Sequence, residues 1–432
     1  MHSGSSGRVA VLCSSRNLSG ILRRDVQGTT FLRSMASSTA GSVFSQTPAS
    51  KVESDDPVVI RERAPTVNEI VLNRSKKFNA LDLDMVRRIR PHYDRWVSSG
   101  QPHTLIMHGT GDKAFCAGGD VASVRESALT DSKIVHDFFY EEYQLNHRIA
   151  TAFDRSGLVQ VSFWDGVTMG GGVGLSLHGK IRVATEKTLF AMPEIGIGLF
   201  PDVGGTYALS RLSGGPEIGM YLALSGARLG AADCMYAGLT THYVPEATFD
   251  EVCREIAQVS STPEAIDEVL KYFGKNAQPP APKDAVMSLE ARHEAIKKCF
   301  AKAESVHEIL ERLESMANDS SVHEDDRTWA GKSLKAIQNA SPSSVCLSFE
   351  ALTRHADEKV GIDDALINEY RLTQRICHPE GDFVEGVRAV LVDKDHSPKW
   401  KFSSVKDVPQ DFIESHFEPL DPNHPRGELS LS

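Results

Sequence analysis

The chain has 432 residues, of which 41% are hydrophobic and 24% are charged, so it can bury a sizeable core in one large domain or two. Its formal net charge of −11 at pH 7 argues against general nucleic-acid binding, because that binding needs a basic surface. No apolar run approaches the roughly 18 residues that a membrane-spanning helix requires, so we expect no membrane span.

The first 50 residues differ in composition from the rest of the chain. They contain five arginines, many serines, no lysine and a single acidic residue, Asp25. A segment that is rich in Arg and Ser, poor in acids and free of a long apolar stretch is typical of mitochondrial presequences. We therefore predict a transit peptide at residues 1–50 and a location in the mitochondrial matrix; a merely disordered tail is the alternative.

After this segment, the apolar residues predict strand pairs that alternate with helices. In chain order we expect two strands around a turn, a helix, a strand with a Gly-rich loop, a strand with a Gly-rich loop and a helix, and two more strands, at residues 57–73, 81–100, 104–120, 159–179 and 181–194. From about residue 250 the chain is mostly helical. This alternation predicts an α/β fold with stacked turns.

Two Gly-rich stretches resemble cofactor-binding motifs but lack a required residue, and the cysteines form no metal-binding pattern. No register of MGGGVG satisfies G-x-G-x-x-G, and in GLSLHGKI the residue Ile181 replaces the hydroxyl that a phosphate loop needs. The seven cysteines are scattered singly, without a C-x-x-C pair or a Cys/His cluster at ligand spacing. We therefore expect no nucleotide cofactor, no metal site and no disulfide framework.

Two Gly-containing corners join a strand to a helix, at CAGGD (116–120) and at GGG (170–172). Each corner offers unpaired backbone N–H groups at the start of a helix, and a pair of such donors forms an oxyanion hole. Tight packing of helix against strand is the alternative reason for the glycines. The two corners together favour the oxyanion hole.

The stretch LFAMPEIGIGLFPDVGG places two acids, Glu194 and Asp202, in apolar and Gly-rich surroundings. A buried carboxylate is unfavourable unless it is paired, hydrogen-bonded or neutralised, so both acids need a reason. Asp202 precedes GGTYALSRL, a predicted helix, and is a candidate N-cap, while Glu194 follows Pro193 and is a candidate cap for the turn before it. Catalytic carboxylates are the other interpretation.

Five stretches of the chain carry a family resemblance: KAFCAGGD, DGVTMGGGVGLSLHG, FAMPEIGIGLFPDVGGTYALSRL, NEYRLTQRI and DFVEGVRAVLVDKDHSPKW. They resemble the crotonase (enoyl-CoA hydratase/isomerase) superfamily. Within it they look like the 3-hydroxyisobutyryl-CoA hydrolases of valine breakdown. The resemblance covers roughly residues 55–400. It implies a crotonase-like spiral of ββα turns, with a core at 55–250 that the mainly helical residues 251–432 complete.

The resemblance also implies an acyl-CoA thioester as substrate and no separate cofactor, because coenzyme A is part of the substrate. It assigns the N–H groups of Ala117 and Gly171 to the thioester oxygen, and places Gly118 in the same substrate-binding loop. Hydratases of the superfamily carry a second glutamate where this chain has Gly174, and a glycine where it has Asp202. Hydration needs two acid/base groups, so the resemblance points to hydrolysis with Glu194 and Asp202 as catalytic residues.

The hydrolases carry a further glutamate in an upstream helix, which the resemblance places in DSKIVHDFFYEEYQLNHRIA. At about 100° per residue, Glu142 falls within roughly 20° of the centre of the apolar face, and Glu141 lies about 80° away. Periodicity places Glu142 on the inward side, and the resemblance to the hydrolases implies that it binds substrate. A partly exposed glutamate whose stem packs along that face is the alternative.

Two rival functions follow from the same resemblance. One is a hydratase or isomerase that acts on another acyl-CoA, which Gly174 disfavours. The other is a non-catalytic crotonase-like subunit of a mitochondrial assembly, which the intact acids and Gly corners disfavour. The expected partners are an acyl-CoA thioester and, in a crotonase-like arrangement, further copies of the chain, with neither nucleic acid nor membrane.

Overall fold

Two sheets organise the molecule, which is described here by a computed structural model of residues 52–130 and 132–431. The predicted transit peptide lies outside these residues. The larger sheet has the order β1-β2-β3-β5-β7-β9, and only the β1–β2 pair is antiparallel. Its strands are β1 (Val58–Ala64), β2 (Val67–Leu72), β3 (Thr104–Gly109), β5 (Val159–Trp164), β7 (Ile181–Ala184) and β9 (His242–Tyr243).

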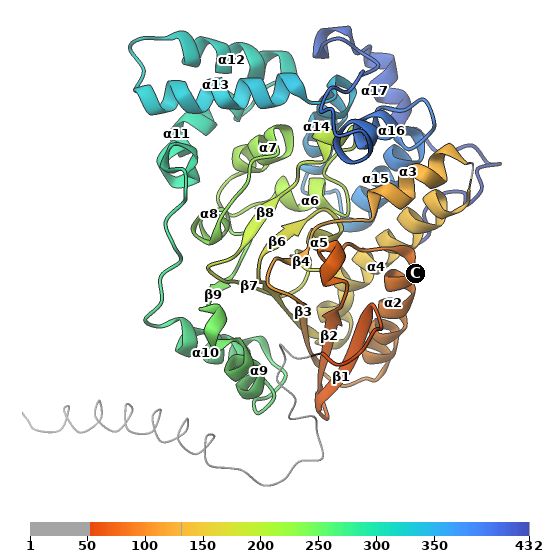
Figure 1. The fold of residues 1–432 in the computed structure, drawn as a ribbon, viewed down its shortest axis with the longest axis vertical. Helices are drawn as coiled ribbons and strands as arrows, with labels where there is room; N and C mark the ends of the chain where they lie inside the picture. Colours follow the sequence, from red (N-terminus) through yellow and green to blue (C-terminus); the bar gives the residue numbers. More distant parts are fainter. Residues whose placement is uncertain (1–51, 131, 432) are drawn as a thin grey trace, which may run out of the picture. The chain divides into compact units, whose positions relative to one another are not determined.

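The smaller sheet is parallel and has the order β4-β6-β8. Its strands are β4 (Ala114–Cys116), β6 (Val167–Met169) and β8 (Leu189–Ala191). Each successive strand pair, β3–β4, β5–β6 and β7–β8, gives one strand to each sheet, so the chain winds as a spiral of ββα turns (Figure 1). The predicted α/β crotonase-like fold is confirmed. The sequence pattern had merged β4 and β6 with their Gly-rich loops, because three residues show no periodicity.

Helix α4 (Ile134–Ser156) carries much of the candidate site. It packs against α2 (Leu83–Ser98) on one side and α15 (Ile362–Ile376) on another. Helix α2 begins where the side chain of Asp82 accepts the Met85 N–H at 3.0 Å, a standard N-cap. Strand β5 is buried along its whole length, as expected for a parallel strand covered on both faces.

The remaining helices surround the sheets and fill most of the chain after residue 249 (Figure 1). The shorter ones before that point are α3 (Val121–Leu129), α5 (Gly171–Gly174), α6 (Gly205–Leu209), α7 (Pro216–Ser225) and α8 (Ala231–Ala237). Those after it are α9 (Phe249–Ile256), α10 (Pro263–Gly274), α11 (Leu289–Phe300), α12 (Val306–Asn318), α13 (Glu324–Asn339), α14 (Pro342–His355), α16 (Asp382–Val387) and α17 (Gln410–Phe417). Within the described ranges, none of the helices is long and apolar enough to cross a membrane.

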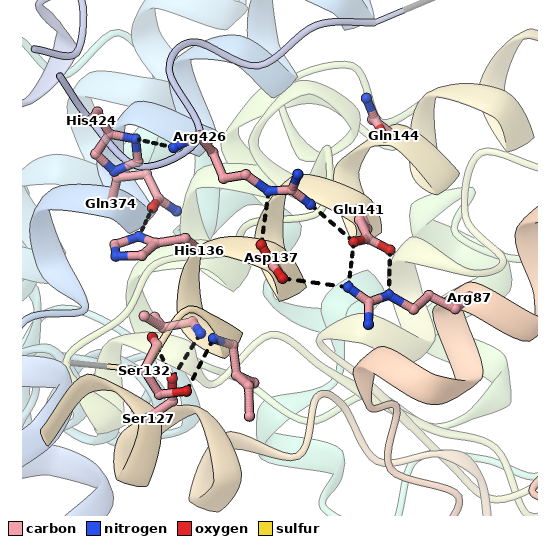
Figure 2. A network of polar contacts seen from close by, with 12 residues as sticks. Arg87, Ser127, Ser132, His136, Asp137, Glu141, Gln144, Gln374, His424 and Arg426 are labelled. Carbon is pink, nitrogen blue, oxygen red and sulfur yellow. Dashed lines mark hydrogen bonds and ion pairs between the residues drawn. The ribbon is translucent and has the colours of Figure 1, made fainter. Parts of the chain in front are cut away.

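Residues near the C-terminus, Arg426 and Ser430, bond to the outer face of α4 (Figure 2). Arg426 forms ion pairs with Asp137 at 2.8 Å and with Glu141 at 3.0 Å, and Arg87 pairs with Glu141 at 2.8 Å. Gln144 donates its side-chain N–H to the carbonyl of Ser430 at 2.7 Å. These contacts hold the outer side of the helix whose inner side faces the candidate site.

Candidate active site

A cavity of about 350 Å³ lies where the two Gly corners meet α4 and the segment that follows β8. All six residues that the sequence analysis assigned to the site line this cavity: Ala117, Gly118, Glu142, Gly171, Glu194 and Asp202. They come from four separate stretches of chain, which the spiral brings together. The cavity is otherwise lined mainly by apolar side chains from α3, α4 and the loop after β8.

The two Gly corners touch each other, which explains why glycine is needed there. A Cβ on Gly171 would lie 2.8 Å from Glu142 Oε1 and 3.3 Å from the Gly119 nitrogen. Gly118 has a φ of +110°, a backbone conformation that other residues rarely adopt. Close packing of the two corners does not exclude an oxyanion hole, because the same glycines can serve both.

The structure corrects the expected oxyanion donor at the first corner. The Ala117 N–H donates to the carbonyl of Phe78 at 3.0 Å, so it is already used. Over the described ranges, the N–H groups of Gly119 and Gly171 have no such acceptor, and the two glycines adjoin across the cavity. The pair that can hold an oxyanion is therefore Gly119 with Gly171. Sequence reasoning missed Gly119 because the positive φ of Gly118 decides which N–H turns inward.

Glu142 and Glu141 lie on different faces of α4. The side chain of Glu142 is buried, with 2% of the residue exposed, and its Oε1 has no hydrogen-bond partner in the described part of the chain. Glu141 instead points outward to Arg87 and Arg426. The helical periodicity thus places a buried carboxyl group with free bonding capacity in the cavity.

Glu194 opens a 3-10 turn, Glu194–Ile197, directly after β8. Its carbonyl accepts the Leu199 N–H at 3.0 Å, which fixes the backbone of the turn. The residue is 6% exposed, and its Oε2 has no hydrogen-bond partner among the described residues. The N-cap position of this turn is Pro193 and no side chain caps it, so Glu194 Oε2 is available for chemistry.

Asp202 is fixed by a long-range hydrogen bond rather than by a cap. The hydroxyl of Tyr143, which follows Glu142 on α4, donates to Asp202 Oδ2 at 2.7 Å. The N-cap of α6 is Gly204, and no side chain caps that helix, so the capping interpretation of Asp202 is wrong. The next residue, Val203, has a φ of +57°, which for a β-branched side chain costs about 1–3 kcal/mol of backbone strain.

Burial raises the pKa values of all three acids, but to different extents. Burial and then the charge of Asp202 raise the pKa of Glu194, and likewise that of Glu142, well above the usual 4.5. Burial raises the pKa of Asp202 to only about 6, because the hydrogen bond from Tyr143 favours its ionised form. Burial therefore favours the protonated forms of Glu142 and Glu194, whereas the hydrogen bond from Tyr143 favours the ionised form of Asp202.

Gly174, where hydratases resembling this chain carry a second glutamate, has no room for a side chain. A Cβ at this position would lie 2.6 Å from Val203 Cβ and 2.8 Å from Asn146 Nδ2. Asn146 is fully buried and its amide has no hydrogen-bond partner among the described residues. Val203 and Asn146 therefore fill the space that a second carboxylate would need.

One basic residue at the cavity escaped the sequence analysis. Arg228, between α7 and α8, is exposed and is the only basic residue among those that line the cavity within the described chain. It stands in no recognisable motif, so only its position in space reveals it. The described ranges contain no group of three or more His, Cys, Asp or Glu side chains arranged to hold a metal ion.

The sequence matches a known family over most of its length. A model described as enoyl-CoA hydratase/isomerase matches residues 67–417. A Xenopus laevis protein named "3-hydroxyisobutyryl-CoA hydrolase, mitochondrial" is 41% identical over 359 residues, which is 83% of this chain and 88% of the relative. The human protein of the same name is 40% identical over 363 residues, or 84% of this chain and 89% of the relative.

Two solved structures share the fold. A carnitinyl-CoA dehydratase from Mycobacterium thermoresistibile aligns with a TM-score of 0.73 and 32% identity, covering 88% of this chain and 99% of the other. An enoyl-CoA hydratase from Rhodobacter sphaeroides 2.4.1 aligns with a TM-score of 0.72 and 33% identity, covering 87% and 100%. The similar sequences are named hydrolases, whereas the similar structures are named dehydratase and hydratase. The choice between these reactions therefore depends on the residues of the site.

Proposed function

This chain belongs to the enoyl-CoA hydratase/isomerase family, and from that premise we propose that it hydrolyses 3-hydroxyisobutyryl-CoA to 3-hydroxyisobutyrate and free coenzyme A in valine breakdown. The observation that carries the choice of reaction is the packing at Gly174, where Val203 and Asn146 exclude a second hydratase-type carboxylate. The relatives of highest identity reported above carry the hydrolase name.

We assign the thioester oxygen to the N–H groups of Gly119 and Gly171, which stabilise the negative charge of the tetrahedral intermediate. Glu194 attacks the thioester carbonyl or activates the water that does, and Asp202 orients the acyl hydroxyl or the water. Burial favours the protonated form of Glu194, whereas the hydrogen bond from Tyr143 favours the ionised form of Asp202, so Asp202 is the group that can accept the proton of Glu194 before Glu194 acts. On the general-base route, Glu194 takes a proton from the water that attacks the carbonyl carbon, the carbon–sulfur bond breaks, and Asp202 gives its proton to the leaving thiolate of coenzyme A. On the covalent route, Glu194 displaces the thiolate, which Asp202 protonates, and water then hydrolyses the Glu194 anhydride, which releases 3-hydroxyisobutyrate and regenerates Glu194.

Glu142 supports this chemistry as a neutral acid. Burial and the charge of Asp202 raise the pKa of Glu142, which favours its protonated form, and in that form its unpaired carboxyl group can donate to the acyl group of the substrate. Its Oε1 lies against the Gly171 corner, beside the position assigned to the thioester oxygen. We propose that it binds substrate rather than attacks it.

The reaction class is tested by comparing two products with one purified protein. We expect the mature protein to release thiol from 3-hydroxyisobutyryl-CoA without added metal or nucleotide, and to hydrate crotonyl-CoA weakly or not at all. Thiol release is followed with a thiol-reactive dye, and hydration by the loss of enoyl absorbance. Strong hydration without thiol release would replace the proposal with the hydratase alternative, and inactivity on both substrates would support the non-catalytic subunit.

The pH dependence tests the charge state of Asp202. With a pKa of about 6, Asp202 loses its ionised form as the pH falls, so kcat/KM for thiol release should decline below about pH 6. In Tyr143→Phe the hydrogen bond that favours the ionised form is lost, so the pKa rises and this acid limb should move to higher pH.

Tyr236→Phe is a matched control, because the Tyr236 hydroxyl bonds His293 rather than a cavity residue. Its pH profile should coincide with that of the wild type. An acid limb that stays in place or moves to lower pH in Tyr143→Phe would show that Asp202 does not set it.

We also propose that the protein works in the mitochondrial matrix, with an acyl-CoA thioester as its partner and without nucleic-acid or membrane partners. The mitochondrial names of the relatives and the Arg-rich, acid-poor N-terminal segment support the location. If residues 1–50 are removed on import, 42 basic and 57 acidic side chains remain, and this acidic balance disfavours nucleic acid as a partner.

A further inference from the structure

A fourth buried carboxylate, Glu369 on α15, belongs to none of the roles assigned above. It is fully buried, with 0% of the residue exposed, and it forms no ion pair with any residue of the described ranges. Its Oε2 accepts the Gly204 N–H at 2.6 Å, and its Oε1 accepts the Thr206 N–H at 3.2 Å and also contacts the Thr206 hydroxyl. Within the described ranges, its hydrogen bonds therefore go to the turn that follows Asp202 and to the first turn of α6.

That turn is held from a second side as well. His178 Nε2 lies 2.8 Å from the carbonyl oxygen of Val203, and burial lowers the pKa of His178, so the neutral ring donates from Nε2. A Cβ on Gly204 would lie 2.5 Å from this same nitrogen. Two hydrogen bonds therefore flank the strained residue Val203. His178 donates to the Val203 carbonyl, and the N–H of the next residue, Gly204, donates to Glu369.

A supporting layer fixes Glu369 itself. The hydroxyl of Thr206 lies 2.8 Å from His355 Nδ1, and His355 Nε2 lies 3.2 Å from the side-chain amide of Asn368. Burial, with the neighbouring Arg211 and Arg354, lowers the pKa of His355 to about 4, so this ring is neutral. The carboxyl group of Glu369 is therefore fixed by a polar network that extends to Gly204, two residues after Asp202.

We propose that Glu369 is a positioning residue for the reaction, which fixes the strained Val203–Gly204 turn and thereby holds Asp202 toward the substrate. This inference rests on the proposed hydrolysis. The carboxyl group is an acceptor for two backbone N–H groups, and its hydrogen-bonding capacity is the property that matters. Removing it releases the turn, and the strain at Val203 then favours backbone conformations in which Asp202 leaves its place.

Glu369→Met tests this, because methionine has a similar length and volume but accepts no strong hydrogen bond. We expect kcat for thiol release to fall about tenfold or more while KM changes less than twofold, since a misplaced catalytic group lowers turnover rather than binding. Glu369→Gln keeps one acceptor oxygen for the Gly204 N–H, and we expect its kcat to stay within about threefold of the wild type.

The matched control is Asp233→Asn, which alters another buried acid whose side chain accepts a backbone N–H, that of Leu289 at 3.0 Å, outside the cavity. Its kcat should equal that of the wild type. A folded Glu369→Met protein with wild-type kcat would overturn the proposal, as would a kcat loss in the Gln variant as large as in the Met variant.

If Glu369→Met fails to fold, Thr206→Val decides the matter. It removes the hydroxyl that contacts both Glu369 and His355, so the carboxyl group loses the layer that fixes it; a lower kcat at unchanged KM then supports the positioning role, and an unchanged kcat overturns it. A wild-type protein that releases no thiol from the hydroxyacyl-CoA would refute the proposed function instead, so the two failures are separate.

Discussion

Replacing Glu194 by Gln is expected to lower kcat for thioester hydrolysis by about 10²- to 10⁴-fold while the protein stays folded. The amide keeps the size of the side chain but can act neither as a nucleophile nor as a base. Because Glu194 Oε2 has no partner among the described residues, the substitution breaks no bond at that oxygen. The measurement is thiol release at saturating substrate, together with a thermal melt.

Asp165→Asn is the matched control for this variant. Asp165 is another acid whose pKa is raised by burial, but it bonds Thr185 and Lys187 away from the cavity. Its kcat should remain within about twofold of the wild type, as for a change that removes no catalytic group. Wild-type turnover in Glu194→Gln would show that the assignment of Glu194 is wrong.

Gly174→Glu is expected to destabilise the protein strongly and to gain no hydratase activity. The new Cβ would lie 2.6 Å from Val203 Cβ, and overpacking of a close-packed core costs about 1–3 kcal/mol before the longer side chain is considered. The added carboxyl group would be buried against Val203 and Asn146, with no cation among these neighbours to pair with it, which raises the cost further. Thermal melting, soluble yield and crotonyl-CoA hydration are the measurements.

Gly230→Ala provides the control, because a Cβ at Gly230 meets no atom within 4 Å and its φ is negative. That variant should melt close to the wild-type temperature. A stable Gly174→Glu protein that hydrates crotonyl-CoA would contradict the steric account and would mean that the reaction class depends on this one residue.

The sequence by itself determined the local features of the site. Helical periodicity placed Glu142 inward and Glu141 outward on α4, since a regular helix fixes the directions of its side chains relative to its apolar face. The two Gly corners were visible because glycines after a strand are a local signal. Glu194 and Asp202 stood out because acids are rare in apolar runs, and the structure brings both to one cavity.

Only the tertiary structure decided how these parts act together. Gly119 replaces Ala117 as the free donor because the carbonyl of Phe78, distant in the sequence, takes the Ala117 N–H. Asp202 does not cap a helix, because Tyr143, 59 residues earlier, donates to it and favours its ionised form. Glu369, which is 165 residues after Gly204, accepts the Gly204 N–H in the turn that follows Asp202. Periodicity carries information over a few residues, whereas hydrogen bonds in irregular loops and the pKa values of buried acids depend on every group that folding brings near them.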